Sequence, residues 1–298
     1  MNIEENARHC PGCGKTRGGA IGVKNNYKIL ACANCRTIYT SVAPSGKPED
    51  EYENYYMVDN LNVPDFIRKR VSEIVRDLSD CRSNNRMLDI GFGSGVLMDA
   101  AKIQGWEAHG LEVSAPAVEQ ARGKGFEVFH GTLEEANYPD GHFDLVTASE
   151  ILEHLNDPSA TLNEIRRILR PGGMFWGTTP SATGLSFRLM GIDWSMIAPP
   201  EHAQLFSAKA VRDLLRQAGF SSVIIKSHGV PPGEIMHYLR HKNNASAAAG
   251  EGHDRLYSAY QLNESLMRSP SRRFIKDTLN ATLNAFALGD SLKIVATT

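Results

Sequence analysis

The sequence has no marked excess of either charge and no long apolar run, and we expect no secretory signal at its start. Its 298 residues contain 32 Lys plus Arg and 34 Asp plus Glu, a net charge of −2. It therefore lacks the basic surplus typical of chains that mainly wrap nucleic acid. No run approaches the roughly 18–20 apolar residues that span a bilayer, and residues 1–8 are polar and acidic, unlike a secretory signal. With 42% hydrophobic residues, we expect a globular protein of the cytoplasm.

Cysteine is scarce outside one short region. Four of the five cysteines form two Cys-x-x-Cys pairs separated by eighteen residues, a spacing that predicts a zinc site. The expected ligands are Cys10, Cys13, Cys32 and Cys35. Four thiolates saturate a tetrahedral Zn²⁺ and leave no open position, so the ion is expected to be structural. Residues 1–45 are predicted to form a zinc ribbon with short strands at 27–31 and 37–40, and Cys81 is interpreted as a free structural thiol.

A glycine-rich turn follows an apolar strand at residues 87–90 and precedes a helical pattern. The turn contains one acidic residue and three glycines: Asp89, Gly91, Gly93 and Gly95. A doubly wound α/β sheet opens its cofactor crevice with this arrangement. A second strand at 108–113 ends near Glu112, where a carboxylate can accept hydrogen bonds from ribose hydroxyls.

Several motifs in order along the chain resemble class I S-adenosylmethionine-dependent methyltransferases, most closely the ubiquinone-biosynthesis-like small-molecule group. They are the Asp89–x–Gly91–x–Gly93–x–Gly95 turn, Glu112, and the segments 143–146, 150–155, 169–173, 202–207 and 214–220. The resemblance implies a seven-stranded, doubly wound Rossmann-like α/β sheet with an antiparallel last strand within residues 86–298, after a linker and helix at 46–85. An NAD-binding fold, the runner-up, would have Gly-x-Gly-x-x-Gly instead.

The resemblance also implies S-adenosyl-L-methionine as cofactor and S-adenosyl-L-homocysteine as product. Asp89 is expected to order the turn and the methionine amine, Glu112 to bind the ribose and Val113 to pack on adenine. The full set of expected cofactor contacts is Tyr55, Asp89, Gly91, Phe92, Gly93, Gly95, Glu112, Val113, Thr132, Leu133, Ser149 and Glu150. Thr132 stands where the family often has an acidic residue, with Glu134 nearby.

Methyl transfer from a sulfonium is an in-line displacement, so catalysis requires the acceptor to be held close to the methyl group. A base is needed when the nucleophile must lose a proton, and His154 and His202 are the candidates because histidine titrates near neutral pH. A second interpretation stays open. Glu150-x-x-Glu153-His154 resembles a divalent-metal pattern of ubiquinone O-methyltransferases, which would hold Mg²⁺.

Two insertions, 181–205 and 231–289, are predicted to form the acceptor pocket. The leading hypothesis is methylation of a small molecule or a sugar moiety of a natural product or polysaccharide pathway. Oxygen is the expected nucleophile, and carbon and nitrogen stay open. Two alternatives stay open. A ribosomal-RNA base methyltransferase would explain a Cys-rich ribbon, but an Asn-Pro-Pro-Tyr-type motif is absent after the fourth strand. The other alternative is a non-catalytic scaffold that binds the cofactor.

Overall fold

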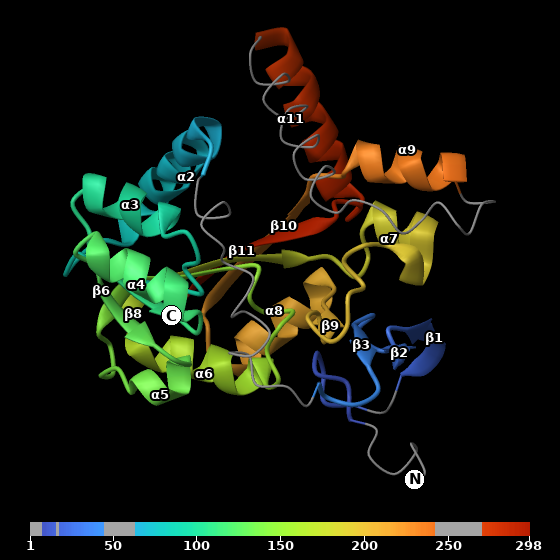
Figure 1. The fold of residues 1–298 in the computed structure, drawn as a ribbon, viewed down its shortest axis with the longest axis horizontal. Coiled ribbons are helices and arrows are strands. Elements are labelled where there is room, and N and C mark those ends of the chain that lie inside the picture. Colours follow the sequence, from blue (N-terminus) through green and yellow to red (C-terminus); the bar gives the residue numbers. More distant parts are fainter. Residues whose placement is uncertain (1–7, 16–17, 45–62, 242–269) are drawn as a thin grey trace.

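The computed structural model describes residues 8–15, 18–44, 63–241 and 270–298. These residues form two sheets of very different size (Figure 1). The larger sheet has seven strands in the order β10-β11-β8-β7-β4-β5-β6. Its strands are β4 (Arg86–Ile90), β5 (Glu107–Glu112), β6 (Glu127–His130), β7 (Phe143–Ser149), β8 (Leu169–Pro180), β10 (Ser222–His228) and β11 (Ser291–Thr297).

The larger sheet confirms the predicted architecture. Strands β4, β5, β6, β7 and β8 run parallel. Strand β11 is antiparallel to both of its neighbours, β8 and β10. The chain enters this sheet at the central strand β4, continues through β5 to the edge strand β6, and then crosses back to β7 on the other side of β4. This reversal is the topological switch point of the sheet, and α/β folds bind their ligands there, at the carboxyl ends of the strands.

Helices cover both faces of this sheet, and the alternation of side chains along the strands explains why. Met87 of β4 packs with Val75 and Ala101 in one cluster, whereas the next residue, Leu88, packs with Leu162 and others in a second cluster. Helices α2 (Asp65–Asp77) and α3 (Val96–Ile103) supply the first layer, and α6 (Pro158–Ile168) and α8 (Ala208–Gln217) supply the second. Successive strand residues point to opposite faces, so the central strands β4 and β7, which are covered on both faces, are buried along most of their length.

Other helices complete the described part of the chain. They are η2 (Ser79–Cys81), α4 (Ala115–Gly123), α5 (Leu133–Ala136), α7 (Leu185–Met190), η3 (Gly191–Asp193), α9 (Pro232–His241) and α11 (Pro270–Ala285). Helices α9 and α11 belong to the insertion before β11, and α11 extends away from the sheet (Figure 1). No helix in the described ranges combines the length and the apolar character that a membrane crossing requires.

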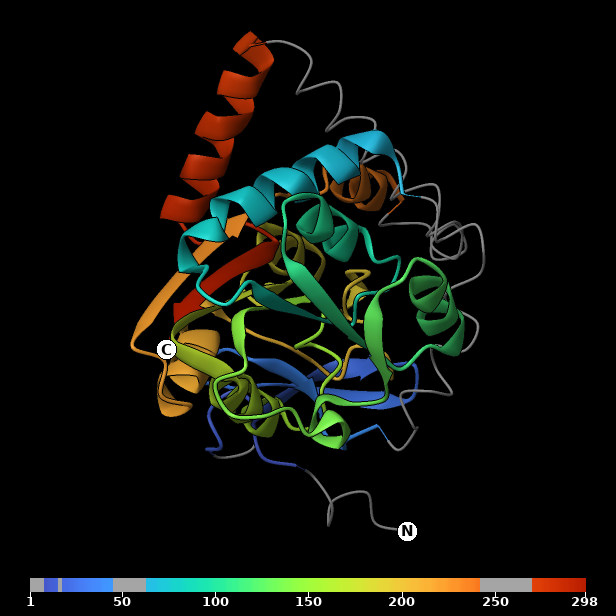
Figure 2. The same cartoon turned by 90° about the vertical axis from the view of Figure 1, so that its left-hand side faces the viewer.

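The smaller sheet contains the predicted ribbon strands and one strand from far along the chain. Its order is β1 (Gly19–Lys24), β2 (Tyr27–Ala31), β3 (Ile38–Thr40) and β9 (Gln204–Leu205). All three pairings are antiparallel. In the view turned by 90°, the blue N-terminal strands lie beneath the larger sheet (Figure 2). The N-terminal segment is thus joined to the large domain through β9, a contact that the sequence analysis did not predict.

Candidate functional site

The glycine turn after β4 has a backbone that only glycine adopts without strain. Gly91, Gly93 and Gly95 have φ values of 65°, 50° and 72°, all in the left-handed region. A Cβ atom on Gly91 would lie 2.2 Å from Cδ1 of Ile151. The turn is therefore packed against the segment that follows β7. Gly95 directly precedes the first turn of α3. The positive end of this helix therefore lies next to the glycine turn.

Glu112 at the end of β5 is buried and fixes the turn. Its Oε2 accepts a hydrogen bond from the Gly93 amide at 3.0 Å, and its Oε1 accepts from the amides of Val113 (2.8 Å) and Ser114 (3.1 Å). Burial raises the pKa of this carboxyl, although the three amides oppose that effect. A carboxylate accepts about four hydrogen bonds. One acceptor position on Oε2 is thus left for a ligand hydroxyl.

Asp89, at the end of β4, is 3% exposed and lies beside Thr147 of β7, whose Oγ1 donates to its Oδ1 at 2.7 Å. Burial, with a smaller contribution from the charge of Glu112, raises the pKa of Asp89 to about 7. A buried carboxyl with this pKa ionises readily when a cation approaches. The side chain is suited to meet an ammonium group, as predicted for the methionine end of the cofactor.

Three of the predicted contacts have side chains engaged elsewhere. Phe92 packs in the core with Met98 and Val118, so only its backbone can face a ligand. Leu133 is 2% exposed within the main core. Thr132 caps α5, with its amide and hydroxyl bonded to Glu135.

The remaining predicted contacts differ in where they lie. Val113 precedes α4, and its carbonyl accepts from His130 Nε2 at 3.0 Å. Ser149 Oγ lies 2.9 Å from Thr178 Oγ1. Glu150 follows with φ 54°, a strained conformation for a residue with a side chain and one that clusters at functional sites. Ser149 and Glu150 are both exposed at the carboxyl edge of the sheet. Tyr55 lies outside the described residues.

The structure brings His154 and His202 together, although 47 residues separate them in the chain. Their rings meet edge to face with centroids 4.7 Å apart. Nδ1 of His154 bonds the Glu201 carbonyl at 2.8 Å, and Nδ1 of His202 bonds the Met196 carbonyl at 2.8 Å. A carbonyl oxygen only accepts, so both Nδ1 atoms carry the proton and both Nε2 atoms hold a lone pair. Burial lowers the pKa of both imidazoles, that of His154 to about 4.

Glu153 completes this group. It is 0% exposed, and Thr179 Oγ1 donates to its Oε2 at 2.9 Å. Its Oε1 lies 3.9 Å from His154 Nε2 and has no hydrogen-bond partner among the described residues. Burial, and then the charge of Glu150, raises the pKa of Glu153 well above its usual value. The raised pKa favours the neutral acid, and a cation bound beside it would favour the ionised form, which makes this position a candidate ligand site.

One ligand atom from each of Glu153, His154 and His202 lies within 4.8 Å of the others. The set does not include Glu150, which the sequence pattern joins to Glu153 and His154. A carboxylate and two imidazole lone pairs can bind a divalent cation. The same lone pairs can accept a proton from a substrate. The link between His202 and the other two could not be found from sequence spacing, because it depends on the path of residues 181–205.

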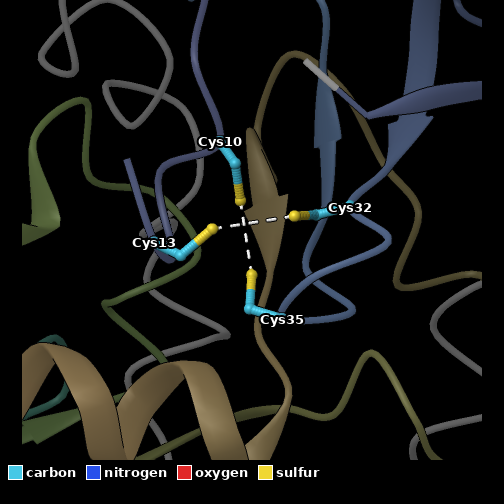
Figure 3. A group of neighbouring side chains, drawn as sticks. All are labelled: Cys10, Cys13, Cys32 and Cys35. Atoms are coloured by element: carbon cyan, nitrogen blue, oxygen red, sulfur yellow. Dashed lines mark hydrogen bonds between the residues drawn. The ribbon is translucent and has the colours of Figure 1, made fainter. Parts of the chain in front are cut away.

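The four predicted zinc ligands converge in the N-terminal segment (Figure 3). Sγ of Cys10 lies 3.4 Å from Sγ of Cys35, and Sγ of Cys13 lies 3.7 Å from Sγ of Cys32. All four are free thiols. Tetrahedral zinc with bonds of about 2.3 Å places its sulfur atoms roughly 3.8 Å apart. The hydrogen bond between Cys10 and Cys35 lowers the pKa of Cys35 to about 5 and raises that of Cys10, so one thiol of this pair ionises readily. The residues fit Zn²⁺.

Comparison with known proteins agrees with this geometry. A family profile described as "Methyltransferase domain" matches residues 64–224. A ubiquinone biosynthesis O-methyltransferase of Aromatoleum aromaticum is 28% identical over 153 residues, which are 47% of this chain and 65% of that protein. A probable S-adenosylmethionine-dependent methyltransferase of Mycolicibacterium smegmatis is 31% identical over 132 residues, 44% of this chain and 48% of that protein. The chain thus spans about half to two thirds of these curated relatives.

Two solved structures share the fold. A SAM-dependent methyltransferase from Archaeoglobus fulgidus superimposes with a TM-score of 0.53 at 19% identity, covering 85% of this chain and 100% of that one. Phosphoethanolamine N-methyltransferase 2 from Haemonchus contortus, in complex with S-adenosyl-L-methionine, gives 0.55 at 14% identity, covering 95% and 71%. At these identities the likeness concerns the fold alone.

Proposed function

The chain belongs to the methyltransferase domain family, and we propose that it transfers a methyl group from S-adenosylmethionine to a hydroxyl group of a small molecule or sugar. The relatives named as O-methyltransferases support this choice of acceptor atom. The observation that carries the proposal is the contact between the rings of His154 and His202 in the segments that follow β7 and β8. Ile151 packs on Gly91, and Glu153 and His154 follow it by two and three residues.

The proposed mechanism divides binding and proton transfer between two groups of residues. Glu112 would hold the ribose of the cofactor, the glycines of the turn would let the backbone approach it closely, and Asp89 would face its ammonium group. The bound cofactor supplies an electrophilic methyl group on a sulfonium. When the S–CH₃ bond breaks and the O–CH₃ bond forms, the hydroxyl proton would move to Nε2 of His202, with S-adenosylhomocysteine as the second product. Because Nδ1 of His202 is fixed by the Met196 carbonyl, Nε2 is the atom available to take this proton.

The first test is calorimetric titration with S-adenosylmethionine and S-adenosylhomocysteine, with NAD as the control. We expect saturable micromolar binding of the two sulfur cofactors only. An acceptor screen over catechols, sugars and RNA fragments then follows methyl transfer by mass spectrometry. His202→Gln should lower turnover with an unchanged Kd for S-adenosylhomocysteine. Transfer to RNA alone would favour the ribosomal-RNA alternative, and binding without any transfer would favour the scaffold.

A second candidate role for the same cluster is divalent-cation binding. The buried Oε1 of Glu153, which no hydrogen bond from the described residues reaches, favours it. Glu153, His154 and His202 would hold the ion, which would lower the pKa of an acceptor hydroxyl bound to it. Titration of chelator-treated protein with Mg²⁺ and Mn²⁺ tests this role. Binding that Glu153→Gln abolishes would support a metal site, whereas full turnover in the presence of chelator would favour His202 as a simple base.

We also propose that the four cysteines hold a structural Zn²⁺. The support is the convergence of four free thiols at spacings near those of a tetrahedral site. Four thiolates leave no position for substrate, so this ion is assigned no step in the chemistry.

A further inference from the structure

We infer that the N-terminal Cys-rich segment is a positioning element for Glu153, His154 and His202, and that Arg8 and Gln204 are the residues that connect it to them. The inference rests on the proposed function, because the cluster it positions is the proposed base. It assigns the segment a role inside the catalytic domain. Three sets of contacts carry it.

The first contact is the pairing of β3 with β9. Ile38 lies opposite Leu205 and Tyr39 opposite Gln204. The Thr40 amide donates to the Ala203 carbonyl at 3.0 Å. Ala203 is the residue after His202, so the backbone that leaves His202 is bonded directly to the N-terminal sheet.

The second contact is a buried side-chain bridge. Gln204 is 1% exposed, and its Nε2 donates to the carbonyls of Leu152, Glu153 and Leu155 at 3.1, 3.3 and 2.6 Å. Its Oε1 accepts from Nη2 of Arg8 at 2.8 Å. The Gln204 amide group therefore spans the backbone on both sides of His154.

Arg8 joins this bridge to the N-terminal sheet. Its Nε donates to the Thr40 carbonyl at 3.1 Å, and its Nη2 also donates to the Ala203 carbonyl at 2.8 Å. One guanidinium thus contacts β3, the residue after His202, and Gln204. Planar guanidinium groups hold several acceptors in fixed directions, so loss of Arg8 should loosen all three together.

The third contact is at the tip of the β1–β2 hairpin. Lys24 Nζ donates to the carbonyls of Ile192 and Trp194 at 2.8 and 3.0 Å, and Asn25 Nδ2 donates to the Pro199 carbonyl at 2.8 Å. This stretch includes Met196, whose carbonyl fixes the His202 ring. The hairpin therefore holds the segment that sets the ring's orientation.

The packing between these segments leaves almost no space. A cavity of about 10 Å³ lies between Ile29 and Ile38 on one side and Ile197 and Leu205 on the other, with His202 in its wall. This volume is close to the minimum for one water molecule. The interface is therefore filled by side chains, as in a protein core, and an acceptor does not fit there.

The cysteine cluster is linked to the same region. Ser207 Oγ donates to the Cys35 carbonyl at 2.5 Å while it caps α8. A Cβ atom on Gly12 would lie 3.0 Å from Cβ of Ala210. A displacement of the cysteine cluster would thus also displace Ser207, the N-cap of α8, which lies five residues after His202.

The test measures the accessibility of individual histidines and needs no methyl acceptor. Full-length protein is treated with diethylpyrocarbonate, and the modification rates of His154, His202 and His130 are followed by peptide mass spectrometry. The variants are Gln204→Leu and Arg8→Met, and Lys28→Met is the matched control because Lys28 is exposed on the same hairpin. His130 is the internal control, since it is exposed on β6.

We expect Gln204→Leu and Arg8→Met to raise the rates at His154 and His202 about fivefold or more, as loss of a buried hydrogen bond favours local opening. His130 should stay unchanged, Lys28→Met should match the wild type, and the Kd for S-adenosylhomocysteine should change less than about twofold. Arg8→Lys, which keeps a cationic donor, should lie between. Unchanged rates at His154 and His202 would overturn the inference.

If Gln204→Leu also exposes His130, that variant has unfolded, and Arg8→Met decides by the same criteria. Removal of metal with a chelator provides an independent arm. It should raise the rates at His154 and His202 before it affects His130, and equal rates with and without chelator would contradict transmission from the cysteine cluster. None of these measurements uses turnover, so they can be interpreted even if the protein does not catalyse the proposed methyl transfer.

Discussion

Replacement of Asp89 by Asn should make the protein more stable at alkaline pH and weaken cofactor binding. Asp89 is buried, and its pKa lies at about 7 instead of 3.8. Asn keeps an oxygen that can accept the bond from Thr147 Oγ1, so the substitution removes mainly the charge. Ionised Asp89 thus lowers the free energy of unfolding, and the same carboxylate can pair with an ammonium group of the cofactor.

The size of the effect follows from the two pKa values. A carboxyl whose pKa is raised on folding contributes stability that is fully present below the unfolded pKa and is lost as the pH rises through the folded pKa. For Asp89 this window runs from about pH 4 to about pH 7 or slightly above. Between roughly pH 5 and pH 8 the wild type should lose about 2–3 kcal/mol through this residue.

The assay is urea unfolding of both proteins at several pH values, with metal present throughout. The free energy of unfolding of Asp89→Asn minus that of the wild type should become more positive as the pH rises. This difference cancels the contributions of other titrating groups. A difference that stays constant between about pH 5 and pH 8 would refute the assignment of an elevated pKa to Asp89.

The same reasoning predicts proton release on cofactor binding. Calorimetry near pH 7 in two buffers of different ionisation enthalpy should detect roughly half a proton released per S-adenosylmethionine bound, because the ligand's ammonium group favours ionised Asp89. Asp89→Asn should abolish this release. Equal release in both proteins would place the titrating group elsewhere.

Three further substitutions or treatments test separate parts of the structure. Glu112→Ala should raise the Kd for S-adenosylhomocysteine by about tenfold or more, because it removes the ligand acceptor and leaves three amides unpaired. Glu119→Ala, an exposed change on α4, should leave the Kd unchanged. Equal Kd values for Glu112→Ala and the wild type would contradict the ribose assignment. Gly91→Ala should lower the free energy of unfolding by about 1–3 kcal/mol, since its φ and its approach to Ile151 both oppose a side chain. Ile151→Ala in the same chain should recover only part of this loss, and full recovery would show that backbone strain is unimportant. Elemental analysis of protein purified without chelator should find about one zinc per chain. Cys35→Ser should lower both the zinc content and the Tm. A wild-type protein that is stable without zinc would refute the structural site.

The parts of the site that depend on neighbouring residues in the chain could be predicted from the sequence. The turn from Asp89 to Gly95 and the acid at the end of β5 are local patterns, and each lies where it was expected. Their meeting also followed, because parallel strands bring their carboxyl ends to one edge. The direction of an individual side chain near such a turn depends instead on the residues that pack around it from distant segments. Phe92 and Leu133 were placed near the cofactor from their positions, but their side chains are part of the core.

Contacts between distant segments could not be predicted. Strand β9 has two residues, too few for a period-2 pattern, and it exists only because β3 offers it an edge. The meeting of His154 with His202 and the bridge from Arg8 to Gln204 depend on that pairing. Strand β1 was also missed, since Gly19–Lys24 has two glycines and an irregular register that weaken the alternation typical of a strand.

The pairing of β3 with β9 has a consequence for the order in which the chain is synthesised. Arg8 and Gln204 are 196 residues apart, so at about 5–20 residues per second the second emerges roughly 10–40 s after the first. During that interval the nascent hairpin has no fourth strand, and the edge of β3 is free to pair wrongly. All four ligand cysteines, however, emerge within the first 35 residues. A metal bound at that stage would hold these strands in register until β9 is synthesised, so a segment made well before Gln204 would complete its sheet only after it.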